Sequence, residues 1–330
     1  MNANASSTLG EVETIDRLAA TLDAYSKGRD VSPTAVDGAT LYRLSAPGTP
    51  TNCIYEPCVA LIVQGEKKVV FGREEFIFGS GRFFVTSIDI PTSAQVTVAS
   101  REQPYLSLVL KLDLALVNEV LQSLVPDTSA AEPTAPRGLV AGHATPELLD
   151  AFVRFAYLLD HPEEIPVMAD LIKREIYFRL LNGEAGVWLR CMVGEGYRAG
   201  GVVRVLDWLK RNFVRPLDID ALAALAGMAR STLHHKFRAL TGTSPLQYQK
   251  CLRLYAARNM MMTERADANT AAHRVGYESV SQFNREYARM FGHPPGRDVR
   301  ETRDAASVRS VSTRIGKERD IPSASVPIGE

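Results

Sequence analysis

Residues 228–245 read MARSTLHHKFRALTGTSP, and residues 278–295 read ESVSQFNREYARMFGHPP. The second stretch repeats the first at a constant offset of 50 residues, with serine, apolar, glycine and proline positions in register. A glycine precedes each stretch, Gly227 and Gly276, at an offset of 49, so the turn of the second copy is one residue longer. A repeat of this kind indicates one supersecondary unit used twice. The matched pairs are Ser231 and Ser281, Leu233 and Phe283, Phe237 and Tyr287, Leu240 and Met290, Gly242 and Gly292, and Pro245 and Pro295.

Each copy has the pattern of a short helix, a glycine turn and a second helix. The short helices are expected at residues 219–226 and at about 270–275, and glycine lets the chain reverse tightly after them. In the second helix the apolar residues form one stripe, which leaves the opposite face free. That free face carries Arg230, Ser231, His234, His235 and Arg238 in the first copy, and Ser281, Gln282, Arg285 and Arg289 in the second.

Short hydrogen-bonding side chains and arginines at the start of an exposed helix suit the major groove of DNA. The alternative is plain helical packing with solvated arginines. The charge distribution favours DNA, because residues 201–300 hold sixteen Lys and Arg against eight Asp and Glu, whereas the whole chain holds 38 of each. A basic module therefore adjoins an acidic body with a net charge of −8.

Residues from about 200 to 300 resemble the DNA-binding domain of the AraC/XylS family of transcriptional regulators. The resemblance lies in LAALAGMARSTL (222–233), FRALTGTSP (237–245) and RVGYESVSQFNREY (274–287). It implies seven helices, a long helix at 246–263 between the two units, and two recognition helices in successive major grooves. By position, base-edge contacts fall on Ser231, His235, Ser281, Gln282 and Arg285, and phosphate contacts fall on Arg230, Arg238 and Arg289.

Two positions depart from the family pattern. Ala229 stands where a helix-capping serine is common, so the first recognition helix is expected to start less firmly. His273 replaces a commonly apolar residue on the short helix of the second unit, and we interpret it as a packed or partly exposed histidine rather than a ligand.

The N-terminal half has a different pattern of apolar and turn-forming residues. Residues 11–27 predict an amphipathic helix with Val12, Ile15, Leu18, Ala19 and Leu22 on one face, and residues 126–146 predict a loop. Between them, short β-rich runs separated by Gly, Pro, Asp and Ser predict a small sandwich or barrel. The expected strands are Leu41–Leu44, Cys58–Gln64, Lys68–Phe71, Glu75–Phe78, Phe83–Ser87, Ala94–Ala99 and Tyr105–Lys111. Two further helical stripes follow, namely Leu148, Leu149, Phe152, Phe155, Leu158 and Leu159, and then Ile172, Ile176, Tyr177, Leu180 and Leu181.

Residues of about 35–195 resemble the cupin-like sensory domain of one AraC-type subgroup, most clearly in YEPCVALIVQGEKKV (55–69). Metal chemistry in such a fold needs several histidines and a carboxylate. The six histidines, at 143, 161, 234, 235, 273 and 293, all lie outside the β-rich segment. We therefore expect a ligand pocket inside the sandwich, with no metal, no cofactor and no enzymatic activity.

Two cysteines near the start of a predicted strand allow two interpretations. Cys53 and Cys58 could sense an electrophile or oxidant, because a thiolate near basic groups is reactive. Alternatively, Cys58 is a small buried apolar residue. Five aromatic residues allow the same choice between packing and a ligand cage: Tyr55, Phe71, Phe76, Phe83 and Phe84.

The sequence thus predicts an α+β protein of two domains. Residues 1–34 form an N-terminal segment, 35–195 a cupin-like sandwich with C-terminal helices, 196–300 the DNA-binding domain, and 301–330 a disordered tail. The expected function is that of a ligand- or stress-responsive regulator, and the alternative is a small-molecule-binding protein with an appended helical interaction module. The expected partners are double-stranded DNA, RNA polymerase, a small-molecule effector and a second copy through residues 146–195. Unpaired cysteine spacing, a non-secretory N-terminus and the lack of a roughly 20-residue apolar run predict a cytoplasmic location without membrane contact.

Overall fold

The computed structural model describes residues 2–124, 138–193 and 200–301. Internal contacts divide the chain into two compact units. The first comprises Met1–Arg211 and Leu217–Tyr248, and the second comprises Asn212–Pro216 and Gln249–Glu330. The boundary cuts the long helix α10 (Pro245–Thr263), so the first helix-turn-helix copy groups with the N-terminal domain.

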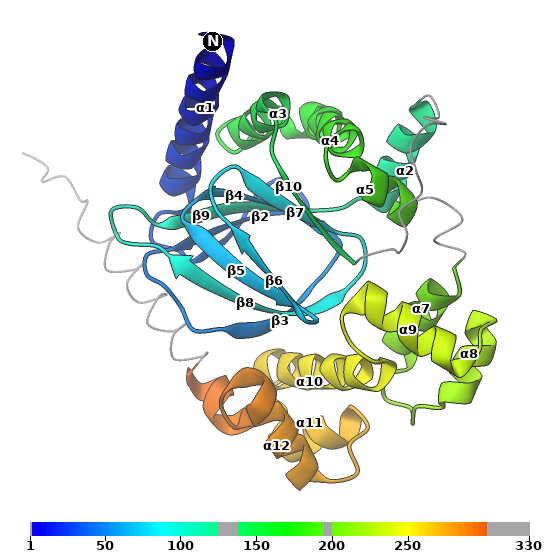
Figure 1. The fold of residues 1–330 in the computed structure, drawn as a ribbon. Helices are drawn as coiled ribbons and strands as arrows, with labels where there is room; N and C mark the ends of the chain where they lie inside the picture. The colour runs from blue at the N-terminus through cyan, green and yellow to red at the C-terminus, as the bar shows by residue number, and fades with distance from the viewer. Residues whose placement is uncertain (1, 125–137, 194–199, 302–330) are drawn as a thin grey trace, which may run out of the picture. The chain divides into compact units, whose positions relative to one another are not determined.

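Two antiparallel sheets build the N-terminal domain (Figure 1). The six-stranded sheet has the order β1-β2-β9-β4-β7-β10, and the four-stranded sheet has the order β3-β8-β5-β6. This two-sheet domain followed by helices confirms the predicted α+β fold. The strands are β1 (Val31–Pro33), β2 (Ala39–Leu44), β3 (Thr51–Tyr55), β4 (Cys58–Gln64), β5 (Glu66–Phe71), β6 (Glu74–Phe78), β7 (Arg82–Thr86), β8 (Ile90–Val98), β9 (Tyr105–Lys111) and β10 (Leu139–His143).

Helices cover one face of the six-stranded sheet, as Figure 1 shows for α1, α3 and α4. The alternation of strand side chains places Val59, Leu61 and Leu108 on this face, where they join the main apolar core. Both predicted helical stripes are buried in the same core, so that prediction is confirmed. The helices are α1 (Asn2–Ser26), α2 (Leu114–Ser123), α3 (Pro146–Tyr157), α4 (Ile165–Asn182) and α5 (Gly186–Val193).

The predicted face of the first helix extends one turn too far. Leu18, Ala19 and Leu22 are buried and Ile15 is half-buried, but Val12 is 53% exposed. Among the helices that the structure describes, none has the length and apolar content needed to cross a membrane.

The opposite face of the six-stranded sheet meets the four-stranded sheet. Phe84 of β7 contacts Tyr55 of β3 and Phe78 of β6, with ring centroids 5.1 and 5.0 Å apart. Phe83 points the other way and lies in the core beneath the helices, so it does not line the interior of the sandwich. The sequence offers both Phe83 and Phe84 as candidates for a ligand cage, but only Phe84 faces the interior of the sandwich.

Five elements lie where the sequence predicted none: β1, β3, β10, α2 and α5. The predicted loop at 126–146 is wrong at β10, whose Leu139 and Val140 are buried where the strand pairs with β7. Helix α2 begins at Asp113, which caps it by accepting from the backbone N–H groups of Ala115 and Leu116. Residues 125–137 and the predicted tail at 302–330 lie outside the described residues.

Asp89, between β7 and β8, joins the sandwich to two helices that flank the first helix-turn-helix copy within the first unit. Its carboxylate lies 2.8 Å from the Nζ of Lys210 on α7 (Gly201–Asn212), and its backbone carbonyl accepts from the hydroxyl of Tyr248 at 3.0 Å. Two turns also touch there, because a Cβ added to Gly242 would lie 2.8 Å from the backbone nitrogen of Gly72. These contacts explain why the first copy packs with the sensory domain.

The second unit has a small core of its own. Leu254, Ala257, Ala271, Phe283 and Tyr287 form its centre. Across both units, the region that resembles the AraC-type domain contains the seven helices that the resemblance implies. They are α7, α8 (Ile219–Ala226), α9 (Arg230–Thr241), α10, α11 (Ala268–Arg274), α12 (Val280–Phe291) and the helical residues 295–301.

Candidate nucleic-acid interface

The first helix-turn-helix copy consists of α8 and α9. Asp218 caps α8, which ends at Gly227 in the left-handed conformation at φ 64°. Helix α9 then buries Leu233, Phe237 and Leu240, as the repeat predicted. The opposite face of α9 is therefore left to solvent.

The predicted contact residues of α9 lie on that solvent face. Ser231, His235 and Arg238 are all exposed. An open hollow of about 420 Å³ adjoins the helix and is lined by His234, His235, Arg238 and Ala239. The face thus offers hydroxyl, imidazole and guanidinium groups, which are the groups that reach base edges and phosphates.

Arg230 is also exposed, but it is not free. Its guanidinium pairs with the carboxylate of Asp220 on α8. Both side chains are about 60% exposed, and exposed pairs contribute only about 0–1 kcal/mol. A DNA phosphate can therefore compete with Asp220 for Arg230.

The start of α9 bears out the expectation for Ala229. This residue occupies the N-cap position, and no side chain there accepts a hydrogen bond from the first turn. In the second copy Ser279 occupies the matched position and accepts from the backbone N–H of Gln282 at 3.3 Å. The two recognition helices therefore differ at their N-termini by one capping hydrogen bond.

The second copy consists of α11 and α12. Asp267 caps α11, and hydrogen bonds from Thr270 hold the pKa of its carboxyl below the ordinary value. Helix α12 buries Phe283 and Tyr287 and leaves Met290 half-buried. The repeat therefore predicted the packed stripe of both recognition helices.

The turn between α11 and α12 needs a glycine. Gly276 has φ 87°, and a Cβ on it would lie 2.3 Å from the carbonyl oxygen of Val214. Arg253 of α10 donates to the carbonyl of Gly276 at 2.8 Å and to the carbonyl of Phe213 at 2.7 Å. The segment before α8, helix α10 and this turn are thereby joined by one side chain.

The predicted contact residues of α12 are all exposed: Ser281, Gln282, Arg285 and Arg289. His273 on α11 is exposed as well, so of the two environments expected for it, packed or partly exposed, the structure shows a solvent-exposed one. Within the described residues, no acidic group forms an ion pair with Arg285 or Arg289. Some other arginines of this unit do pair with acids, for example Arg274 with Glu264 at 2.6 Å. Arg285 and Arg289 thus place two positive charges without acidic partners on the exposed face of this recognition helix.

Glu286 is a site residue that the sequence did not reveal. Its carboxylate accepts from Gln282 Nε2 at 3.1 Å, from Lys250 Nζ at 2.6 Å and from the hydroxyl of Tyr277 at 2.7 Å. Burial raises the pKa of Glu286, but the Lys250, Tyr277 and Gln282 contacts outweigh burial and lower it. Glu286 thereby stays ionised and orients Gln282, so it is a positioning residue. The four-residue spacing of Gln282 and Glu286 was the available signal.

Asp298 fixes the other end of α12. This buried carboxylate accepts from Arg258 Nε and Nη2 at 2.9 and 3.0 Å and from the hydroxyl of Tyr287 at 2.7 Å. The guanidinium of Arg258 also lies 4.7 Å from the centroid of the Phe291 ring. The buried face of α12 is therefore anchored by a charge network as well as by apolar packing.

Comparison with known proteins decides the family. Residues 35–188 match the model described as "AraC-type transcriptional regulator N-terminus", and residues 222–301 match the model described as "Helix-turn-helix domain". The chain belongs to the AraC/XylS family of transcriptional regulators.

Curated relatives match part of this AraC-type chain. The HTH-type transcriptional activator RhaS of Pectobacterium atrosepticum is 28% identical over 102 residues, which cover 31% of this chain and 37% of RhaS. The RCS-specific HTH-type transcriptional activator RclR of Escherichia coli is 37% identical over 78 residues, which cover 24% of this chain and 28% of RclR. The chain thus spans about a third of the length of the curated relatives that it matches.

Solved structures of ToxT from Vibrio cholerae share the fold. The structure with an unsaturated fatty acid bound has a TM-score of 0.56 at 11% identity and covers 79% of this chain and 94% of ToxT. The structure with (E)-4-(8-methylnaphthalen-1-yl)but-3-enoic acid has a TM-score of 0.58 at 13% identity and covers 79% and 97%. The likeness extends over both regions of this AraC-type chain and concerns the fold alone.

Of the two cysteines of the AraC-type N-terminal domain, Cys58 is buried and Cys53 is half-buried. Cys58 is 4% exposed, and burial raises the pKa of its thiol to about 11. The thiol of Cys53 lies 3.1 Å from the hydroxyl of Thr92. A thiol with so high a pKa is not a thiolate at neutral pH, which favours the packing interpretation of Cys58. Among the described residues, no three His, Cys, Asp or Glu side chains gather as a metal site would require.

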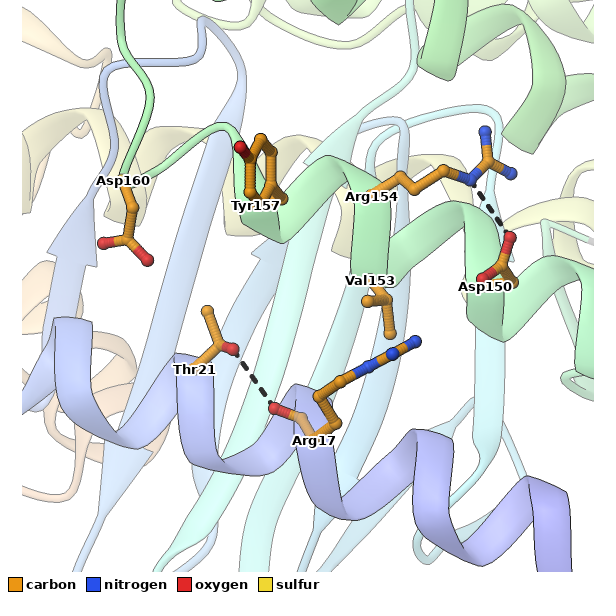
Figure 2. Close-up of a pocket in the computed structure, with 7 residues that line it drawn as sticks. All are labelled: Arg17, Thr21, Asp150, Val153, Arg154, Tyr157 and Asp160. Atoms are coloured by element: carbon orange, nitrogen blue, oxygen red, sulfur yellow. Dashed lines mark hydrogen bonds and ion pairs between the residues drawn. The ribbon is translucent and has the colours of Figure 1, made fainter.

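A surface hollow of about 380 Å³ lies between α1 and α3 of the same domain (Figure 2). Arg154 projects along its rim toward Asp150, with Nε 3.0 Å from the carboxylate, and pairs with Glu175 at 2.7 Å. None of the predicted effector residues lines this hollow. It is lined by Arg17, Thr21, Asp150, Val153, Arg154, Tyr157 and Asp160.

Proposed function

We propose that this chain is a sequence-specific DNA-binding transcriptional regulator, controlled by a small molecule through its N-terminal domain. One observation carries the proposal. In both copies of the repeat, the apolar stripe of the recognition helix is packed while all eight predicted DNA-contact residues are exposed. A helical interaction module would not need serine, glutamine and arginine at matched exposed positions of two helices.

The proposed division of labour follows from side-chain chemistry. Arg285 has no acidic partner in the described chain and can donate two hydrogen bonds to a guanine, while Gln282 can pair with an adenine. Arg238 and Arg289 would contact phosphates, which fix the register of the protein on the duplex without reading sequence. Ser231, His235 and Ser281 complete the base-edge set.

Regulation is the second part of the proposal. The two ToxT structures hold organic acids, which supports an effector for this chain, and RhaS and RclR are named activators, which supports activation through RNA polymerase. Asp89 offers a route from the sandwich to the first helix-turn-helix copy, because it contacts Lys210 on α7 and Tyr248 on α10. The Tyr248 ring in turn packs edge-on against Phe237 of α9, with ring centroids 5.5 Å apart. The family role argues against an enzyme and for action in the cytoplasm.

A second copy of the chain is the proposed occupant of an apolar face on α4. Val167, Leu171 and Phe178 are 68%, 56% and 41% exposed, which is unusual for large apolar side chains on one helix. The face lies within the 146–195 segment where the sequence placed dimerisation. Light scattering of the full chain should report a dimer that Leu171→Asp converts to a monomer, and a monomeric wild-type chain would remove this part of the proposal.

The DNA-binding proposal is tested by fluorescence anisotropy on a duplex selected in vitro and on a scrambled duplex. Arg285→Ala should lose about 5- to 150-fold of the discrimination between them, because a bidentate base contact contributes about 1–3 kcal/mol. Arg297→Ala is the matched control, since it removes an equal charge outside the recognition helix in the same unit. Full discrimination by both Gln282→Ala and Arg285→Ala would show that α12 does not read bases.

A further inference from the structure

Lys67 of β5 points into the sandwich, whereas the adjacent Lys68 points out. The register pairs Lys67 with Phe78 and Val96, which are both buried, and the next residue on its face is the fully buried Val69. Lys68 lies on the outer face, where its Nζ is 3.3 Å from the carboxylate of Glu75. Strand alternation thus separates two consecutive lysines, one paired and one turned inward.

The inward ammonium lies among aromatic rings rather than acids. Lys67 Nζ is 5.2 Å from the ring centroid of Tyr55 and 6.0 Å from that of Tyr105. Within the described residues no carboxylate forms an ion pair with Lys67. Glu56, near this end of the sandwich, is held by Lys111 at 2.6 Å. A half-buried ammonium with only ring faces as partners keeps most of its capacity to bind an anion.

A second polar group near Lys67, the hydroxyl of Tyr55, lacks a strong partner. This hydroxyl is buried and forms no hydrogen bond of ordinary geometry among the described residues; only the weakly accepting thiol of Cys53 lies beside it. Burial, with Cys53 and Tyr105 nearby, raises the pKa of Tyr55 well above the ordinary value, so the phenol remains a donor at neutral pH. A buried hydroxyl without a partner costs about 1–3 kcal/mol. An acceptor atom placed beside Lys67 and Tyr55 would remove that cost.

We propose that this end of the sandwich binds the carboxylate of a small apolar acid, with Lys67 as its ion-pair partner and Tyr55 as a hydrogen-bond donor. The rings of Phe78 and Phe84, which contact each other inside the sandwich, would adjoin the apolar body of the acid. This inference rests on the proposed function in treating the acid as the effector. It deepens that function by naming the chemical class and the two residues that select it.

The surroundings favour an acid over a neutral or cationic ligand. A neutral ligand would leave the ammonium without a counter-charge, and a cation would be repelled by it. The other side chains of the interior near Lys67 are aromatic or aliphatic, or carry hydroxyl or thiol groups, the thiols being those of Cys53 and Cys58. None of them carries a negative charge at neutral pH, so a single negative charge on an otherwise apolar molecule matches this lining.

The test is isothermal titration of the full chain with benzoate and octanoate, and with benzamide as the neutral analogue of benzoate. We expect one acid or the other to bind, benzamide to bind at least tenfold more weakly than benzoate, and Lys67→Met to weaken acid binding at least tenfold. Tyr55→Phe should weaken it about fivefold to tenfold. Lys68→Met removes the same charge from the outer face and should leave acid binding unchanged.

Three results would overturn the inference: no binding of either acid to the wild-type chain, equal binding of benzamide and benzoate, or equal losses in Lys67→Met and Lys68→Met. DNA binding of the same preparations without acid keeps the two proposals apart. If the acid site is wrong, the chain still discriminates its DNA site; if the DNA-binding proposal is wrong, discrimination fails in every variant, including wild type.

Discussion

Asp298→Ala is expected to loosen the second recognition helix selectively. The substitution leaves the hydroxyl of Tyr287 buried without a partner and leaves Arg258 without its carboxylate. Breaking a buried ion pair costs about 3–5 kcal/mol. The side chain of Arg258 is 29% exposed and its guanidinium stacks on Phe291, so water and the ring compensate part of the loss. We therefore expect a local destabilisation of about 2–3 kcal/mol.

Amide hydrogen exchange measures this effect where it occurs. In the full chain, peptides from Val280–Phe291 should exchange about 30- to 150-fold faster in Asp298→Ala, whereas peptides from the sandwich should not change. Tyr287→Phe removes only one hydrogen bond and should cost about 1 kcal/mol. Arg297→Ala breaks an exposed pair and should cost less than about 0.5 kcal/mol. Equal exchange of α12 in Asp298→Ala and Arg297→Ala would refute the anchoring role of Asp298.

Three further predictions concern the helix caps, the pH dependence of stability and the ion pair between Arg230 and Asp220. Ala229→Ser should raise the free energy of unfolding by about 0.5–1 kcal/mol, and Ser279→Ala should lower it by a similar amount. Denaturant titration measures both changes, and changes of the same sign would contradict the difference in capping. Because the pKa of Glu286 is lowered on folding, its stabilisation is complete above the ordinary value of 4.5 and is lost as pH falls through the folded pKa. The difference in thermal midpoint between wild type and Glu286→Gln should therefore shrink as pH is lowered from 6 to about 3.5, and a constant difference would count against it. Asp220→Asn should release Arg230 from its ion pair and strengthen binding to any DNA duplex by about two- to fivefold at low salt. Unchanged affinity in this variant would show that Arg230 does not contact a phosphate.

The sequence could predict the DNA-binding region well because its signals are local and occur twice. The apolar stripe around Phe237 recurs around Tyr287, and Gly227 and Gly276 mark both turns. Helix α8 begins and ends where the pattern placed it, and the long helix α10 differs from its predicted range by one residue. Repetition removed the ambiguity that a single helix pattern leaves.

Features that depend on distant partners could not be predicted in the same way. The composition of residues 126–146 predicts a loop where β10 forms, because the burial of this strand comes from pairing with β7, which lies more than 50 residues earlier. Phe83 and Phe84 are adjacent and look alike, and only the pairing of β7 decides which of them faces the sandwich interior. The inward orientation of Lys67 and the burial of the Asp298 carboxylate could not be predicted either, because tertiary contacts determine the partners of both side chains.

The central claim is that two helices of one chain read DNA, and in vitro selection from random duplexes tests it most directly. The wild-type chain should yield two blocks of base preference with centres about 10 base pairs apart, one helical turn of DNA. His235→Ala should flatten one block, and Arg285→Ala should flatten the other. A single block, or loss of the same block in both variants, would contradict the account.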